Sequence, residues 1–350
     1  MVFNERIKPL LVNRKETESP DFNRESWMYR ANNELHSEFE PLEPDVNTLP
    51  AEHRQLLKAA EKYYTNTNDQ FNLFKLKLKF GDIAGAQAIL ENYSGDNDNV
   101  DFHYYNPDNP DDINSVNLAQ LKKAYMLKDL YSATKNIEDK KRAYSGFIEF
   151  AENQQAVKPL TATEASAVGY WQARSVAGDN NEKEIATQFS IGFYRQMAKN
   201  RSNVGDIWWE GIALRQIAKI SKDPQNKEAG LAIARDLVAK YQKEGDWKKA
   251  ALWARDLNDL DPSEENIHQM QDYWQKYIEE AESVGDVRAI GKAHWQLYKR
   301  LKKIEGSADE AETHRLAAIE NYQKLLIQVK DTDNLEKIRE CYWVFSELIK

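Results

Sequence analysis

Cysteine is almost absent from this chain, which has Cys341 as its single thiol in 350 residues. An internal disulfide is therefore excluded, and so is a zinc site built from several thiolates. Aromatic residues surround Cys341 in the sequence, so we expect a small buried side chain and not a reactive thiol. One cysteine is compatible with the cytoplasm and with an oxidising compartment.

Long apolar runs are also missing. No stretch approaches the 18 consecutive apolar residues that indicate a transmembrane helix. The first twenty residues, MVFNERIKPLLVNRKETESP, lack the apolar stretch of a signal peptide. We therefore expect a soluble protein without membrane insertion. The expected location is the cytoplasm, or the periplasm or another extracytoplasmic space if a leader has been removed.

Glycine and proline are scarce, with 14 and 10 residues, and no alternating run of Val, Ile and Thr is bounded by turns. Both observations favour helices over a turn-rich β protein. Hydrophobic residues make up 41% of the chain, which is enough for a substantial core. The length allows two or three ordinary domains or one long stack of repeats.

Basic residues are outnumbered, because 48 Lys and Arg stand against 57 Asp and Glu and give a formal net charge of −9. A protein that binds nucleic acid neutralises phosphates with a basic face, so this balance argues against general nucleic-acid binding. One basic cluster lies on an expected helix and is interpreted as its solvated face: Lys299, Arg300, Lys302 and Lys303.

The first fifty residues differ from the rest of the chain. Residues 22–38 can form one short helix, and Pro41, Pro44 and Pro50 follow it within ten residues. Each proline removes a backbone donor and disfavours the α conformation of the residue before it. We therefore expect residues 1–50 to form an extended N-terminal arm that lies along a helical body.

The helical body is expected over residues 51–350, with one interruption at 94–115, SGDNDNVDFHYYNPDNPDDINS. Asp96, Asp98 and Asp101 offer the hard oxygen ligands that calcium prefers. An EF-hand would need Gly in place of Asp101 and Glu in place of Pro107. We therefore expect a polar surface loop held by turn chemistry, with calcium binding as the alternative and no other metal.

The pair Gly-Asp recurs along the helical body, at 81–82, 178–179, 205–206, 245–246 and 285–286, and the last three copies are 40 residues apart. Glycine can adopt the left-handed conformation that ends one helix, and aspartate can cap the next one. Apolar residues at spacings of three and four flank the pairs, as in amphipathic helices. Such helix hairpins are antiparallel and bury their remaining apolar surface by stacking.

One unit carries a family pattern with a large residue pair, a turn, a small crossing residue and a final proline: Leu237, Tyr241, Gly245, Asp246, Ala250 and Pro262. Residues 231–264 thereby resemble a tetratricopeptide repeat (TPR). Residues 271–304 resemble a second copy, and residues 67–93 a weaker one. The resemblance implies an all-α fold, a superhelical stack of antiparallel helix hairpins that forms a TPR-like α-solenoid. HEAT or armadillo repeats are the alternative.

Motifs of catalysis are missing. The sequence has no G-x-x-x-x-G-K-[ST] loop and no H-E-x-x-H, and its six histidines are scattered. His294 lies on the apolar face of its expected helix, so we interpret it as a core histidine. Neighbouring acidic pairs such as Glu279 and Glu280 point in different directions on a helix. We therefore expect no catalytic residue, no cofactor and no enzymatic activity.

Stacked hairpins form an extended groove without needing catalytic residues. The expected function is a non-catalytic scaffold that holds a protein or peptide on the concave face of the superhelix. The alternatives are a structural or accessory subunit of a larger complex, and an all-α enzyme or cell-envelope helper. Residues 169–200 favour the last alternative, because they are similar to the helical superhelix of soluble lytic transglycosylases, although the catalytic domain of that family is absent.

The TPR resemblance also implies which residues face the groove, because particular positions of each first helix line the concave side. Eight residues follow from this register: Arg195, Lys199, Arg235, Gln242, Asp272, Gln275, Glu279 and Glu282. The groove would be basic near its middle and acidic toward the C-terminus. Such a divided surface would fix the direction of a partner of mixed charge.

Overall fold

The computed structural model describes residues 49–95, 99–103, 113–155, 159–203, 205–330, 332 and 334–349. This part of the chain contains 14 helices and two short strands. The chain divides into two compact units, one of residues 1–37 with 95–119 and one of residues 38–94 with 120–350. The expected N-terminal arm lies almost entirely outside the described residues.

The described part of the smaller unit is mainly a β-hairpin. Strands β1 (Asn99–His103) and β2 (Ile113–Asn117) pair antiparallel, with Val100 opposite Val116. The prediction of a surface loop at 94–115 is therefore wrong for these two segments. Strands of five residues within a stretch rich in Asp and Asn show too little alternation of apolar and polar residues to be recognised in the sequence. Of the calcium candidates, Asp101 lies in β1, and Asp96 and Asp98 lie outside the described residues.

The larger unit is all-α, as the sequence predicted. In chain order its helices are α3 (Ala51–Asn66), α4 (Gln70–Lys79), α5 (Ile83–Glu91), α6 (Ala119–Thr134), α7 (Ile137–Gln155), α8 (Pro159–Ser175), α9 (Asn180–Asn203), α10 (Ile207–Ile220), α11 (Pro224–Glu244), α12 (Trp247–Leu260), α13 (Glu264–Val284), α14 (Val287–Leu301), α15 (Ala308–Val329) and α16 (Leu335–Leu348). None of the described helices has the length and apolar content that a membrane span requires.

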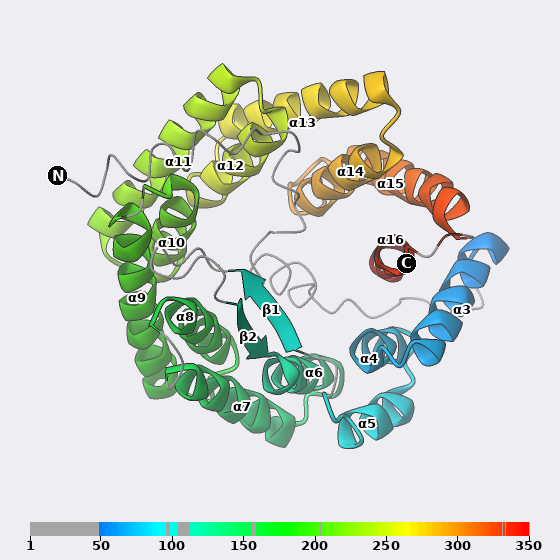
Figure 1. Ribbon diagram of the computed structural model, residues 1–350, viewed down its shortest axis with the longest axis horizontal. Coiled ribbons are helices and arrows are strands. Elements are labelled where there is room, and N and C mark those ends of the chain that lie inside the picture. The colour runs from blue at the N-terminus through cyan, green and yellow to red at the C-terminus, as the bar shows by residue number, and fades with distance from the viewer. Residues whose placement is uncertain are drawn as a thin grey trace. The chain divides into compact units, whose positions relative to one another are not determined.

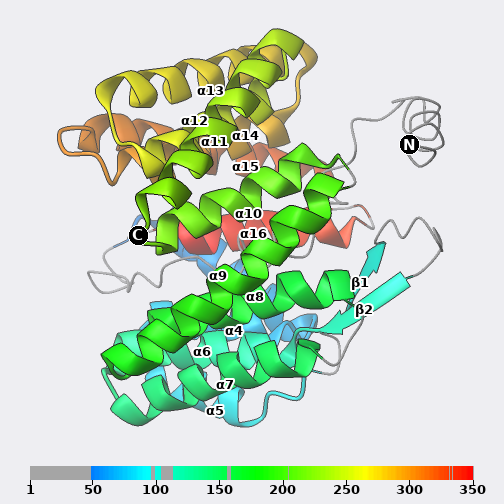
Figure 2. The same cartoon turned by 90° about the vertical axis from the view of Figure 1, so that its left-hand side faces the viewer.

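Successive helices of this unit pack against one another and lie in two layers (Figure 1). The even-numbered helices form an inner layer, and the odd-numbered helices form an outer layer. In the side view of Figure 2, the helices from α7 to α12 follow one another from bottom to top. The core lies between the layers, where Trp253, Trp274 and Phe147 are almost completely buried. Cys341 is also fully buried, as expected, and burial raises the pKa of its thiol to about 12.

The last of the described helices contacts the first of them. Helix α16 packs against α3, where the rings of Tyr342 and Tyr63 lie 5.1 Å apart. Arg339 of α16 forms an ion pair with Asp69, the residue before α4, at an N–O distance of 2.8 Å. An open stack would leave its terminal hairpins apart, whereas here α16 and α3 are in contact.

The Gly-Asp pairs form turns between helices, as the sequence predicted. Gly245 has φ +72° in the left-handed region, and the Asp246 carboxylate accepts a hydrogen bond of 3.0 Å from the Lys249 amide. The pairs at 81–82, 205–206 and 285–286 have the same geometry. At 178–179 only the aspartate cap is present, because Gly178 is outside the left-handed region.

Small residues allow helices to approach closely. A Cβ atom added at Gly230 of α11 would lie 2.5 Å from the Ala218 Cβ atom of α10, well inside van der Waals contact. A similar crossing is predicted from the sequence at Ala250, which is fully buried in α12. Both positions therefore leave little room for a larger side chain.

Candidate functional site

The eight residues predicted to line a concave groove are all exposed, and they lie on α9, α11 and α13. In Figure 1 these three helices lie in the outer layer. The predicted groove residues are Arg195, Lys199, Arg235, Gln242, Asp272, Gln275, Glu279 and Glu282. Several already have partners within the chain. Arg235 pairs with Glu228 at 3.4 Å, and Gln242 accepts a hydrogen bond of 2.9 Å from the Tyr273 hydroxyl.

The burial pattern explains which helices take the inner layer and which take the outer layer. Helix α12 buries a continuous run from Ala250 to Ala254, so it is enclosed on every side and takes the inner position. Helix α11 buries one stripe that includes Leu231, Ala234 and Leu237, and its opposite face is exposed. A helix with one apolar stripe is suited to the outer layer.

Charged side chains of the inner layer are paired with one another. Arg215 of α10 contacts Asp256 of α12, and Lys219 of α10 contacts Asp259 at 2.7 Å. Arg300 of α14 also contacts Asp259. Burial alone would raise the pKa of Asp256, but the neighbouring Arg215 and Arg255 guanidiniums hold it well below its usual range. These ion pairs connect neighbouring inner helices. Their charged groups already have partners within the chain and are not available to a ligand.

Elsewhere, a cleft of about 690 Å³ lies along one side of α9. Helix α9 contributes residues at helical spacing to its wall, among them Lys183, Thr187, Ile191 and Arg195. The end of α8, the turn 221–223 and the start of α11 complete the wall. Its volume is in the range typical of ligand sites. We call this space the α9 cleft.

The α9 cleft carries an excess of positive charge. Four basic side chains line it, Arg174, Lys183, Arg195 and Lys222, against two acidic ones. The two carboxylates already have partners, because Glu184 accepts from the Gln188 amide at 2.6 Å and Asp223 caps α11.

The contacts of these four basic side chains show which of them can bind an anionic ligand. Arg174 is held in place, because its Nε atom donates to the Thr187 hydroxyl at 3.1 Å. Within the part of the chain that the structure describes, Lys183, Arg195 and Lys222 form no ion pair. Three cations of the cleft are therefore available to an anionic group.

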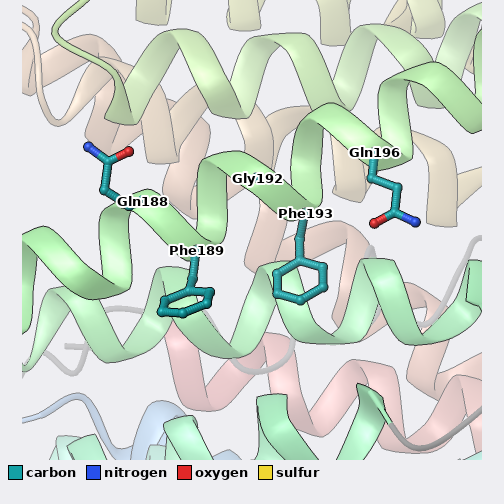
Figure 3. Close-up of a pocket in the computed structure, with 5 residues that line it drawn as sticks. All are labelled: Gln188, Phe189, Gly192, Phe193 and Gln196. Atoms are coloured by element: carbon teal, nitrogen blue, oxygen red, sulfur yellow. The ribbon is translucent and has the colours of Figure 1, made fainter.

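An exposed apolar surface adjoins the α9 cleft. Phe189 and Phe193 project from the same side of α9, and Gly192 lies between them (Figure 3). Both rings stack on Tyr170 of α8, with centroid distances of 4.9 and 5.7 Å. Phe189 nevertheless remains 49% exposed, and Ile185, one turn earlier, is 44% exposed. We call Ile185, Phe189, Gly192 and Phe193 the aromatic patch.

The α9 cleft and the aromatic patch are continuous, because Gln188 lines both. Together they form the candidate site, with free cations on one side of α9 and the partly exposed rings of the aromatic patch on the other. Such a combination suits a ligand that carries negative charge next to an apolar group. Of the eight residues predicted from the sequence, Arg195 alone lines this site.

The sequence does contain a signal for this site, which is a second apolar stripe on α9. Helix α9 has one apolar stripe that is buried, represented by Ile191, Tyr194 and Met197. Its second apolar stripe, Ile185, Phe189 and Phe193, has the spacing i, i+4, i+8. An outer helix needs one stripe for the core, so the second stripe is available for a partner.

His294, interpreted from the sequence as a core histidine, has a hydrogen-bonding partner in the structure. Its side chain is half-buried, and its Nδ1 atom lies 2.8 Å from Nδ1 of His314 on α15. Burial and the nearby His314 lower the pKa of His294 to about 4. Among the residues that the structure describes, no group of three His, Cys, Asp or Glu side chains could hold a metal ion.

No protein-family model matches this sequence, and a search of curated proteins finds no match to it.

Proposed function

We propose that this protein is a non-catalytic scaffold that binds a protein or peptide through the candidate site on α9. The observation that carries the proposal is the aromatic patch. On one side of an outer helix, Phe189 is 49% exposed and Phe193 is partly exposed, and both rings are held in place by stacking on Tyr170. Exposed aromatic side chains of fixed orientation contribute strongly to binding, because little conformational entropy is lost when a partner covers them.

Titratable side chains with strongly shifted pKa values lie away from the candidate site, which supports binding over catalysis. Burial raises the pKa of Asp129 to about 6 and lowers that of Lys299 to about 8. Both residues belong to inner helices, and neither lines the α9 cleft. An active site would bring such groups together in one pocket. The candidate site instead offers cations, amides and rings, which are binding groups.

A second part of the proposal concerns how the helix hairpins are arranged. We propose a TPR-like superhelical stack in which each hairpin contacts the next. The Gly-Asp turns at 40-residue spacing and the packing of consecutive helices support this arrangement. The contact of α16 with α3 implies that the stack completes its turn within this chain.

Affinity capture from a native extract tests the function. The double substitution Phe189→Ser and Phe193→Ser removes both rings, and Ile327→Ser, at a 67% exposed position of α15, is the matched control. We expect the wild type and the control to capture the same proteins, and the double variant to lose them. Mass spectrometry identifies the captured proteins, and circular dichroism checks that both variants remain folded.

Two outcomes would change the conclusion. Capture of the same proteins by the double variant would contradict binding through α9. A single stoichiometric complex that survives removal of the rings would favour the alternative, a structural or accessory subunit of a larger assembly.

A further inference from the structure

We infer that the α9 cleft binds the carboxylate side chains of an acidic peptide segment, and that an apolar side chain of the same segment covers the aromatic patch. This inference rests on the proposed function and specifies its partner. The two surfaces are joined at Gln188, so one continuous segment can reach both.

The free cations define the charge of the ligand. Lys183 and Arg195 are twelve residues apart on α9, which corresponds to about 18 Å at the rise of an α-helix. An extended peptide spans that distance with about five or six residues. Lys222 reaches the cleft from the turn before α11. A short segment with several carboxylates therefore matches the spacing of the cations.

Helix dipoles do not decide the sign of the site. The cleft lies beside the N-terminal ends of α9 and α11, and also beside the C-terminal ends of α8 and α10. The partial charges at these ends are opposite and offset one another. The excess of positive charge therefore comes from the side chains.

A peptide fits better than a nucleic acid. The whole chain has a net charge of −9, and two carboxylates, Glu184 and Asp223, lie within the cleft. A long phosphate backbone would meet more repulsion from both sources than a short segment with a few carboxylates. The aromatic patch also adjoins the charged wall, and an apolar side chain flanked by carboxylates complements both surfaces.

Fluorescence anisotropy with synthetic peptides tests the inference. The probe is a labelled eight-residue peptide with one central Trp flanked by Glu and Asp. A first comparison peptide has Lys in place of the acids, and a second has Ser in place of the Trp. We expect the acidic Trp peptide to bind most tightly, with an affinity that falls as salt is raised.

The protein variants locate the binding. Lys183→Glu combined with Arg195→Glu should weaken binding of the acidic Trp peptide at least tenfold at low salt. Lys243→Glu combined with Lys330→Glu makes the same change in net charge at exposed positions outside the cleft, and should leave binding within twofold. Thermal melts followed by circular dichroism confirm that both double variants are folded.

The outcomes separate this inference from the proposed function. Capture that depends on Phe189 and Phe193 but not on Lys183 and Arg195 would leave the scaffold proposal standing and overturn the acidic partner. Equal binding of the acidic and basic peptides would overturn it as well. Tighter binding of a single-stranded oligonucleotide than of the acidic peptide would show that the cleft is a phosphate site.

Discussion

At the scale of single residues, the contact between His294 and His314 joins helices α14 and α15. The Nδ1–Nδ1 distance of 2.8 Å allows one shared proton, so one ring donates and the other accepts. Glu310 lies 4.0 Å from the far side of His314 and Gln271 of α13 donates to Glu310, but no carboxylate separates the two rings. Protonation of both rings would place two positive charges in direct contact.

This pair predicts a loss of stability in mild acid. Burial and the neighbouring ring lower the pKa of His294 to about 4 in the folded protein, and burial also lowers the pKa of His314. The unfolded chain binds these protons near pH 6.5, so the unfolded state gains protons first as the pH falls. We expect the free energy of unfolding to decrease by about 1–2 kcal/mol between pH 7 and pH 4.5, after allowance for solvent screening.

Urea unfolding of the wild type and of His314→Gln at several pH values measures this effect. Glutamine retains a hydrogen-bonding partner for His294 and removes the second titrating ring. The variant should show a shallower loss of stability between pH 7 and pH 4.5. The same pH dependence in both proteins would assign the acid sensitivity to other groups.

At the scale of helices and turns, the sequence predicted where helices begin and end better than it predicted which layer each helix occupies. Gly245 and Asp246 identify a turn because left-handed glycine and an aspartate cap are local requirements. The layer of each helix depends on how many of its sides are covered, as the buried run from Ala250 to Ala254 shows. The aromatic patch could not be predicted from the sequence. A phenylalanine such as Phe189 is normally assigned to the core unless its helix is known to lie in the outer layer.

The capping aspartates allow a direct prediction. Asp246 accepts from the Lys249 amide and also forms an ion pair of 2.7 Å with the Lys249 side chain. Asp246→Ala should lower the free energy of unfolding by about 1–2 kcal/mol, because an amide at the start of α12 loses its partner. Asp246→Asn keeps a capping oxygen and should lower it by less than about 1 kcal/mol. Equal losses in chemical denaturation would indicate that the charge matters and the cap does not.

At the scale of the whole helical unit, the contact between α16 and α3 is the feature that the spacing of apolar residues in the sequence could not predict. Amphipathic patterns identify each helix, but the contact of α16 with α3 depends on how all the intervening helices pack. Contacts such as Arg339 with Asp69 join residues 270 positions apart in the sequence. No local signal specifies a pairing over such a distance.

Closure predicts how the unit opens. In an open repeat stack the terminal helices fray first, because each has one neighbouring hairpin. Here α3 and α16 cover one another, and Phe345 of α16 is fully buried. Hydrogen exchange followed by mass spectrometry should therefore show protection in both helices close to that of α12. Phe345→Ala should reduce protection of α3 and α4 more than that of α10 and α11, and rapid exchange of α3 in the wild type would contradict closure.

The meeting of α3 with α16 also has a consequence during synthesis of the chain on the ribosome. The helix that covers α3 is completed about 270 residues after residues 51–79 have been synthesised. At an elongation rate of about 5–20 residues per second, that delay lasts roughly 15–55 seconds. During this interval the side of α3 that will receive α16, including Tyr63, remains uncovered. A nascent chain stalled before residue 335 should therefore bind holdase chaperones through its first helices, and release should coincide with translation of α16.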